Sequence, residues 1–258
     1  REGRRTNEKM VFITISGNAQ YMMNHHQLQG YIAAVKKALD SQAPSIFLRI
    51  QSIGKNRPTT FYEMHLSGPD IMREQLKVCG KTFNFKISPD SFFQPNPEQA
   101  EFLYTKVIKL LEPTKDDVVF DLYCGTATMG IIISSFVKKV ICVEINPYAV
   151  CDAELNIIEN KRENIRVYRQ DVSKAVLEIQ EPVDIVILDP PRAGLGEKAI
   201  SNVIALSPKK IAYVSCNPRT QSLDITSLCA QGYHLKAIYP VDQFPHTIHL
   251  ENIAILEK

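Results

Sequence analysis

The chain has 258 residues, with 30 Lys plus Arg against 28 Asp plus Glu and a formal net charge of +2. This length allows one large or two ordinary domains, and 45% hydrophobic with 22% charged residues excludes a disordered chain. No apolar run approaches the roughly 20 residues that cross a bilayer, and the opening REGRRTNEKM is unlike a signal peptide. Six cysteines without CxxC spacing predict free thiols, so we expect a cytoplasmic protein with no membrane contact.

The charge is unevenly distributed along the chain. Residues 1–86 contain 13 Lys plus Arg against 6 Asp plus Glu, a net +7, whereas residues 87–258 contain 17 against 22, a net −5. A basic first third is typical of a module that faces a polyanion, and chance variation in surface charge explains it equally well.

The first third of the chain predicts a small α+β domain, residues 1–87. Alternating apolar residues predict strands, and helical spacing predicts a helix at Gly30–Leu39. The expected strands are Val11–Ser16, Ser45–Ile50, Thr59–Leu66 and Thr82–Ile87. The run SPDSFFQPNP that follows holds three Pro and interrupts the periodicity, so we place the domain boundary at residue 87.

From residue 88 onward, apolar strands alternate with helices. An amphipathic helix is expected at Glu98–Leu111, with Phe102, Val107 and Leu111 at core spacing. The expected strands are Val118–Leu122, Val140–Glu144, Ile165–Arg169, Val183–Leu188, Lys210–Ser215, His234–Tyr239 and Asn252–Leu256, with helices that include Met129–Phe136 and Pro147–Asn160. This order predicts the α/β class for residues 88–258: a Rossmann-like, doubly wound and mostly parallel sheet.

Acidic residues end the first three strands of this sheet. Asp121 precedes the turn CGTATMG and a helix, Glu144 could bind a ribose diol, and Asp171 could hold an adenine amino group. The series predicts a nucleoside ligand such as S-adenosylmethionine, and the turn lacks the second Gly of a nicotinamide site. For Asp121, a turn or helix-capping carboxylate is the alternative.

Two further motifs end strands on the same side of the sheet, and a third precedes the last strand. LDPPRAGL places Asp189 at a rigid turn, and VSCNPR presents Cys216 either as a nucleophile or as a buried structural thiol. DQFPHTIHLE holds acid–base groups, but His246 and His249 have no third ligand nearby, so we expect no metal site.

SFFQPN, DLYCG, LDPPRAGL, VSCNPR and DQFPHTIHLE in this order resemble the RNA (uracil-5-)methyltransferases over roughly residues 82–258. The resemblance implies a class I methyltransferase that forms 5-methyluridine in tRNA or ribosomal RNA with S-adenosylmethionine. It assigns Cys216 as the nucleophile and Glu251 as the general base. The implied cofactor contacts are Gln94, Tyr123, Thr128, Glu144, Asp171 and Asp189, and the implied substrate contacts are Phe92, Arg192 and Arg219.

Two features depart from the family pattern. Ala127 stands where the family's turn usually has Gly, which predicts weaker cofactor binding. Many members also carry an N-terminal β-barrel RNA-binding domain and a four-cysteine iron–sulfur site, and neither has a counterpart here, so RNA contact would fall to residues 1–87, or the N-terminal part was removed. We expect no iron–sulfur cluster and a monomer. Two other functions stay open: an RNA or nucleobase amino-group methyltransferase, and a catalytically idle RNA-binding relative.

Overall fold

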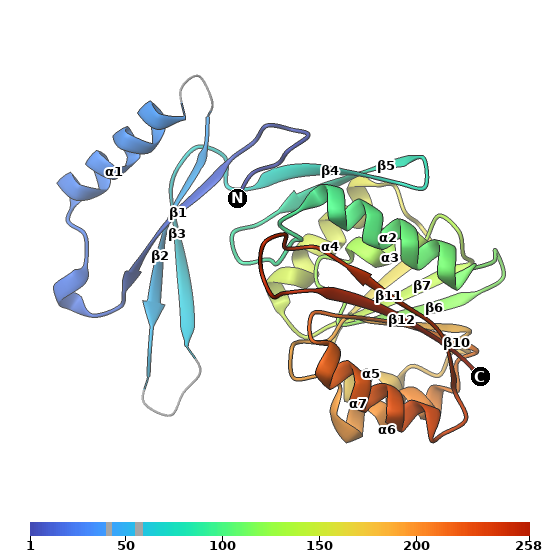
Figure 1. Ribbon diagram of the computed structural model, residues 1–258. Helices are drawn as coiled ribbons and strands as arrows, with labels where there is room; N and C mark the ends of the chain where they lie inside the picture. Colours follow the sequence, from blue (N-terminus) through green and yellow to red (C-terminus); the bar gives the residue numbers. More distant parts are fainter. Residues whose placement is uncertain (40–42, 55–58) are drawn as a thin grey trace. The chain divides into compact units, whose positions relative to one another are not determined.

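The computed structural model describes residues 1–39, 43–54 and 59–258, which form two compact units. The first comprises Arg1–Gln75 and Phe85–Pro95, and the second Leu76–Asn84 and Asn96–Lys258. A hairpin of β4 (Met72–Val78) and β5 (Lys81–Ile87) has its two outer ends in the first unit and its turn in the second (Figure 1). The predicted division into residues 1–87 and 88–258 states which segments fold as domains. The two units are defined by contacts between residues and do not test this division, so it stays a prediction.

The first unit contains a three-stranded sheet and one long helix. In the sheet, β2 (Ser45–Ser52) pairs in parallel with β1 (Met10–Ser16) and antiparallel with β3 (Thr60–Ser67). A 3-10 turn at Ala19–Tyr21 leads to α1 (His25–Ala38). This helix begins at His25 rather than at Gly30 because Asn24 and Gln27 form a capping box.

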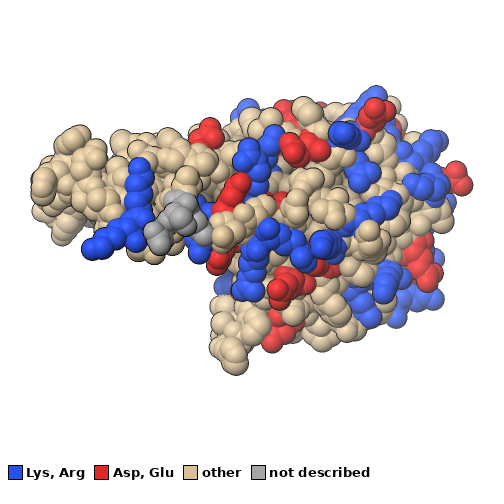
Figure 2. Space-filling model, turned by 90° about the horizontal axis from the view of Figure 1, so that it is seen from above, with Lys and Arg blue, Asp and Glu red and all other residues tan. Residues whose placement is uncertain are grey.

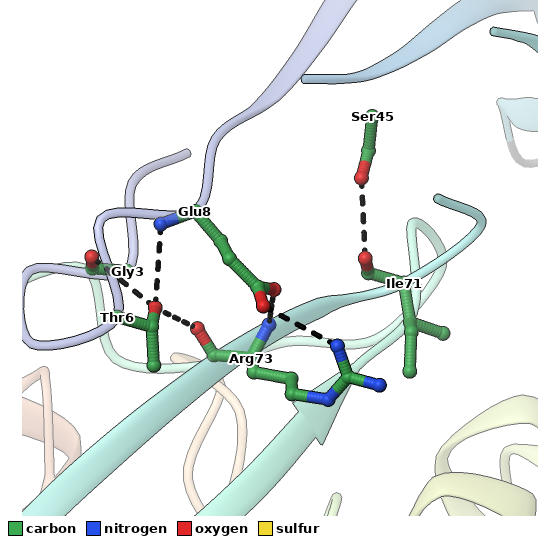
Figure 3. Close-up of polar contacts among 6 residues, drawn as sticks. All are labelled: Gly3, Thr6, Glu8, Ser45, Ile71 and Arg73. Carbon is green, nitrogen blue, oxygen red and sulfur yellow. Dashed lines mark hydrogen bonds and ion pairs between the residues drawn. The ribbon is translucent and has the colours of Figure 1, made fainter. Parts of the chain in front are cut away.

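Side-chain hydrogen bonds tie the start of the chain to β4 (Figure 3). The Thr6 hydroxyl donates to the carbonyl of Arg73 over 2.6 Å, and the Glu8 carboxylate accepts from the Arg73 backbone N–H over 2.6 Å. The Ser45 hydroxyl donates to the carbonyl of Ile71 over 3.1 Å. Segments far apart in sequence therefore build one unit.

The second unit is built on a seven-stranded sheet in the order β11-β12-β10-β9-β6-β7-β8. The strands are β6 (Val118–Leu122), β7 (Lys139–Glu144), β8 (Ile165–Arg169), β9 (Ile185–Leu188), β10 (Lys210–Ser215), β11 (His234–Val241) and β12 (Glu251–Glu257). The five from β8 to β10 along this order are parallel, and β12 runs antiparallel to both of its neighbours. The predicted α/β fold is confirmed.

Helices cover both faces of this sheet (Figure 1). One layer holds α2 (Pro97–Leu111), α3 (Thr128–Ile133) and α4 (Pro147–Glu159), and the other holds α5 (Val172–Glu178), α6 (Gly196–Leu206) and α7 (Pro218–Cys229). On α2, Val107 and Leu111 are buried as predicted, but Phe102 is 46% exposed. Phe102 lies at the edge of the buried face, where its ring contacts Tyr239.

Basic and acidic side chains are interspersed on the visible face of the molecule (Figure 2). The charged residues at 40, 55 and 57 lie outside the described residues. Among the helices that are described, none is both long and apolar enough to cross a membrane. All six cysteines are free thiols.

Candidate active site

The candidate site lies in the second unit, where the parallel strands end. The order of the sheet reverses between the neighbours β6 and β9, since the chain continues from β6 to β7 on one side and from β9 to β10 on the other. In such sheets ligands bind outside the carboxyl ends of the strands at this reversal. The motifs that follow β6, β9 and β10 meet there.

The turn after β6 needs an unusual backbone. The N–H groups of Tyr123 and Cys124 both donate to the carbonyl of Val143, over 3.0 and 3.2 Å. Tyr123, Gly125 and Ala127 then adopt left-handed conformations, with φ of 65°, 55° and 57°. Ala127 is fully buried, and its left-handed backbone carries the conformational cost that a non-glycine residue incurs there.

Glu144 holds this turn in place. Its carboxylate accepts the backbone N–H of Gly125 over 3.0 Å and, through the other oxygen, those of Ile145 and Asn146 over 2.8 and 2.7 Å. Two carboxylate oxygens can accept about four hydrogen bonds, so room for one further donor remains. A ribose hydroxyl is a donor of this kind.

Asp121 lies beneath the turn, 2% exposed, and its Oδ2 atom has no hydrogen-bond partner among the described residues. Burial raises the pKa of Asp121 to about 7, and the nearby Asp189 carboxyl adds to this shift. Tyr104 of α2 is close to both carboxyls, and burial raises the pKa of its hydroxyl. An unpartnered buried acceptor favours a ligand that brings a donor or a positive charge.

Cys216, Glu251, Asp189 and Arg192 come together at the ends of β9, β10 and the start of β12. Cys216 is partly exposed; burial and the Glu251 carboxyl raise the pKa of its thiol, whereas the hydrogen-bonded Arg192 guanidinium lowers it. Glu251 is 4% exposed, and burial together with Asp189 raises its pKa to about 7, against the effect of Arg192. These four residues place a thiol, two carboxyls and a guanidinium side by side.

Asp189 keeps an exposed surface, although dense protein surrounds its carboxyl on the other sides. This desolvation raises the pKa of Asp189 to about 7.

Cys124 and Cys142 differ from Cys216 in their surroundings. Both are buried, and the hydrogen bond that the Cys124 thiol donates to Cys142 is the largest of several influences that raise the pKa of Cys124. Neither has a neighbouring cation to favour the thiolate form. Cys216 is the cysteine whose surroundings fit a nucleophile.

The other predicted site residues are placed as follows. Thr128 is buried and its hydroxyl lies 3.0 Å from that of Thr126, while Asp171 caps α5 by accepting the N–H of Ser173 over 2.9 Å. Arg219 is exposed on the first turn of α7. Phe92 and Gln94 belong to the first unit, where Phe92 is 67% exposed and Gln94 is 7% exposed with an unpartnered amide oxygen.

His249 also joins the Cys216 group, since its Nδ1 lies 3.4 Å from a guanidinium nitrogen of Arg192. His246 lies on the surface with a left-handed backbone, φ 65°. In the part of the chain that the structure describes, no group of three or more His, Cys, Asp or Glu is arranged to bind a metal ion.

Sequence reasoning missed Tyr104 and Asp224. Tyr104 is one of several apolar-face residues of α2, and Asp224 lies inside α7, away from any motif. Helical spacing places Asp224 on the same face as Asn217 and Thr220, and this was the signal available for it.

A model of the tRNA (uracil-5-)-methyltransferase family matches residues 9–258. A protein of Protochlamydia amoebophila named as an uncharacterized RNA methyltransferase is 44% identical over 99% of this chain and 61% of its own length. One of Chlamydia muridarum with the same name is 40% identical over the whole chain and 65% of its own length. The chain thus spans less than two thirds of these relatives.

Two solved structures of methyltransferases from Pyrococcus abyssi are similar to this chain. The tRNA (uracil-54, C5)-methyltransferase of Pyrococcus abyssi, crystallised with S-adenosyl-L-homocysteine, is similar with a TM-score of 0.71 and 28% identity, over 99% of this chain and 58% of that one. Trm5b of the same organism shares the fold, with a TM-score of 0.64 and 18% identity over 95% and 72%. With its match to the family model over nearly its whole length, the chain belongs to the tRNA (uracil-5-)-methyltransferase family.

Proposed function

We propose that this protein methylates carbon 5 of a uridine in tRNA or ribosomal RNA, with S-adenosylmethionine as the methyl donor and Cys216 as a covalent catalyst. The observation that carries the proposal is the Cys216 group, in which a thiol, the Arg192 guanidinium and the Glu251 carboxyl lie together. Methylation of an amino group would need no such thiol.

The residues after β6 and β7 fit S-adenosylmethionine. The unpartnered Oδ2 of Asp121 and the carboxyl of Asp189 suit a ligand with positive charges, and Glu144 has room for a ribose hydroxyl. When bound, this cofactor supplies an electrophilic methyl group on a sulfonium. Tyr123, Thr128, Asp171 and Gln94 are the remaining proposed contacts.

The chain's own residues would activate the base and remove its proton. The Cys216 thiolate adds to carbon 6 of uracil, and the electron pair of the 5,6 double bond makes carbon 5 nucleophilic. Once carbon 5 carries the methyl group, the Glu251 carboxylate removes the carbon-5 proton. The electrons of that C–H bond re-form the double bond, and the bond between carbon 6 and sulfur breaks to release Cys216. Both reacting groups must be deprotonated, which Arg192 favours.

The first unit is the proposed RNA-contacting module. Phe61 and Tyr62 of β3 are 48% and 62% exposed, and the Arg49 guanidinium lies 5.7 Å from the ring of Phe61. Exposed rings next to guanidinium groups bind unstacked bases.

Phe92 is proposed to stack on a base and Arg192 and Arg219 to contact the RNA, since a uracil must leave its stack for carbon 6 to be reached. Action as a monomer in the cytoplasm, where the six thiols stay reduced, completes the proposal.

The test uses RNA that contains 5-fluorouridine. The protein is incubated with S-adenosylmethionine and either tRNA or ribosomal RNA transcripts, and covalent complexes are separated by denaturing electrophoresis. We expect an adduct with the wild-type protein and with Cys229→Ala, which removes an exposed cysteine far from the reaction, and none with Cys216→Ala. Fluorine cannot leave as a proton does, so the adduct persists.

With ordinary RNA, Glu251→Gln should accumulate the covalent intermediate because the proton acceptor is lost. Rapid turnover by this variant would contradict the role of Glu251. If the wild-type protein binds both RNA and cofactor yet forms no adduct, the covalent mechanism is wrong. Mass spectrometry of digested RNA identifies the methylated nucleoside and separates the tRNA from the ribosomal RNA possibility.

A further inference from the structure

One face of α7 holds the loop of residues 189–195. Asn217, Thr220 and Asp224 follow one another at helical spacing and share this face. The carbonyl of Arg192 accepts hydrogen bonds from Asn217 Nδ2 over 2.9 Å and from Thr220 Oγ1 over 3.3 Å. The backbone of Arg192 is therefore attached to the helix that directly follows Cys216.

Asp224 provides the third attachment. Its Oδ2 atom accepts the backbone N–H of Leu195 over 2.9 Å and the hydroxyl of Tyr213 over 2.6 Å. Asp224 is 7% exposed and Tyr213 is fully buried in β10. Both donors would lose their acceptor in a place with little water, so the loop end at Leu195 is firmly held against the sheet.

Gly194 allows this close approach. It has φ of +82°, and its N–H closes a turn on the carbonyl of Pro191 over 2.9 Å. A Cβ atom at this position would lie 2.7 Å from Asp224 Oδ2 and 3.1 Å from Thr220 Cβ. The loop and the helix touch so closely here that no side chain fits between them.

Arg192 connects this attachment to the reacting groups. Its backbone is bound to α7, while its guanidinium reaches the thiol of Cys216 and lies 3.4 Å from His249. We propose that Asp224 is a positioning residue that holds the 189–195 loop on α7 and thereby keeps the Arg192 guanidinium at the thiol of Cys216. The catalytic meaning of this placement rests on the proposed function.

Two carboxyls near Cys216 oppose the ionisation of its thiol: Glu251 of β12 and Asp189 at the end of β9. The Arg192 guanidinium is the positive charge that favours the thiolate. Asp224 itself faces Tyr213, the loop amide of Leu195 and, at longer range, Tyr123. A small displacement of the Arg192 guanidinium would therefore leave the thiol among carboxyls, where the thiolate is disfavoured.

The test measures how fast iodoacetamide alkylates Cys216 between pH 6 and 10, with peptide mass spectrometry to separate it from the exposed Cys151 and Cys229. Asp224→Ala should move the pH midpoint of alkylation upward and slow the reaction at pH 7.5 roughly 3- to 10-fold, because a tenfold change in thiolate fraction corresponds to one pKa unit. Asp224→Asn keeps an oxygen at the same place and should restore most of the wild-type profile.

Two comparisons separate positioning from general stability. Tyr213→Phe removes one hydrogen bond to Asp224 but leaves the Leu195 attachment, so it should lower the unfolding midpoint without moving the alkylation profile. Arg192→Gln should move the profile at least as far as Asp224→Ala, and the double variant should go no further than Arg192→Gln. An unchanged profile in Asp224→Ala, or additive shifts in the double variant, would overturn the proposal.

Gly194→Ala provides a second route if Asp224→Ala does not fold. Its added methyl group pushes the loop off α7 and should move the alkylation profile in the same direction; an unshifted profile would overturn the proposal as well. Alkylation needs neither RNA nor cofactor. A wild-type protein that forms no 5-methyluridine, together with a shifted profile in these variants, would reject the proposed function and keep the positioning role of Asp224.

Discussion

At the scale of single residues, Asp121 is a buried carboxyl of the proposed cofactor site. Its Oδ2 has no partner in the described structure, and burial raises its pKa to about 7, against about 3.9 in an unfolded chain. Between these two pH values the folded state holds a proton that the unfolded state has released. Raising the pH through this range therefore lowers the free energy of unfolding of the ligand-free protein.

We predict that Asp121→Asn removes this part of the pH dependence. The variant should be more stable than the wild type by about 1–3 kcal/mol at pH 8, and the difference should shrink toward pH 4. Urea unfolding at pH 4, 5, 6, 7 and 8 provides the measurement, with Asp116→Asn as an exposed control. Parallel curves for Asp121→Asn and the wild type would show that Asp121 ionises in the folded protein as it does in water.

The residues that sequence reasoning found and missed differ in one physical respect. Cys216, Asp189 and Glu144 stand directly after parallel strands, where position in the fold alone predicts that side chains face the ligand. Asp224 and Tyr104 lie inside helices, and their roles depend on which segments pack against them. Helical spacing predicts that Asp224 shares a face with Asn217 and Thr220, but the segment that packs on this face is set by the tertiary structure.

At the scale of elements, continuous apolar runs predicted the inner parallel strands β6, β7, β9 and β10 because both of their faces are buried. β4 was missed because Glu74 interrupts its apolar face at Met72, Leu76 and Val78. Glu74 is 1% exposed, and its carboxylate accepts the backbone N–H groups of Arg4, Arg5 and Gln75. In the sequence alone, a buried carboxylate whose hydrogen-bond donors come from a distant segment cannot be distinguished from a residue that faces solvent.

The short helix α3 is pressed against the sheet through Gly130. A Cβ atom there would lie 2.6 Å from Cys142 Sγ and 3.0 Å from Asp121 Oδ2. We predict that Gly130→Ala lowers the free energy of unfolding by about 1–2 kcal/mol, because the overlap with β7 outweighs the gain of up to about 1 kcal/mol in helix propensity.

Denaturant unfolding tests this prediction, and Cys142→Ala provides the matched rescue. The single Cys142→Ala change leaves a cavity, whereas the double variant fills part of it with the Gly130→Ala methyl group. The double variant should therefore be more stable than the sum of the two single changes predicts. Additive effects would mean that α3 moves away from the sheet without strain.

At the scale of the whole molecule, the hairpin of β4 and β5 belongs to both units. Its turn is held by the second unit: the backbone N–H of Asn84 donates to Asn160 Oδ1 over 2.9 Å, and Asn160 Nδ2 returns a bond to the Asn84 carbonyl over 2.6 Å. Phe83 is fully buried, with the Arg162 guanidinium 5.4 Å from its ring. The predicted boundary at residue 87 assigns Phe83 and Asn84 to the first domain, although both contact Asn160 or Arg162 of the second unit.

This arrangement predicts the stability of fragments. A fragment of residues 76–258 keeps the hairpin turn, and a fragment of residues 88–258 lacks it. The free energy of unfolding of the longer fragment should be higher by about 2–5 kcal/mol, the scale set by a buried Phe and its hydrogen bonds. The longer fragment should therefore unfold at a higher urea concentration. Phe83→Ala in the longer fragment should reproduce most of the loss, while Thr82→Ala, at the exposed neighbouring position, should leave its midpoint nearly unchanged. Equal midpoints for the two fragments would instead establish residues 88–258 as a folding domain by themselves, because the hairpin would then contribute nothing to the stability of the sheet.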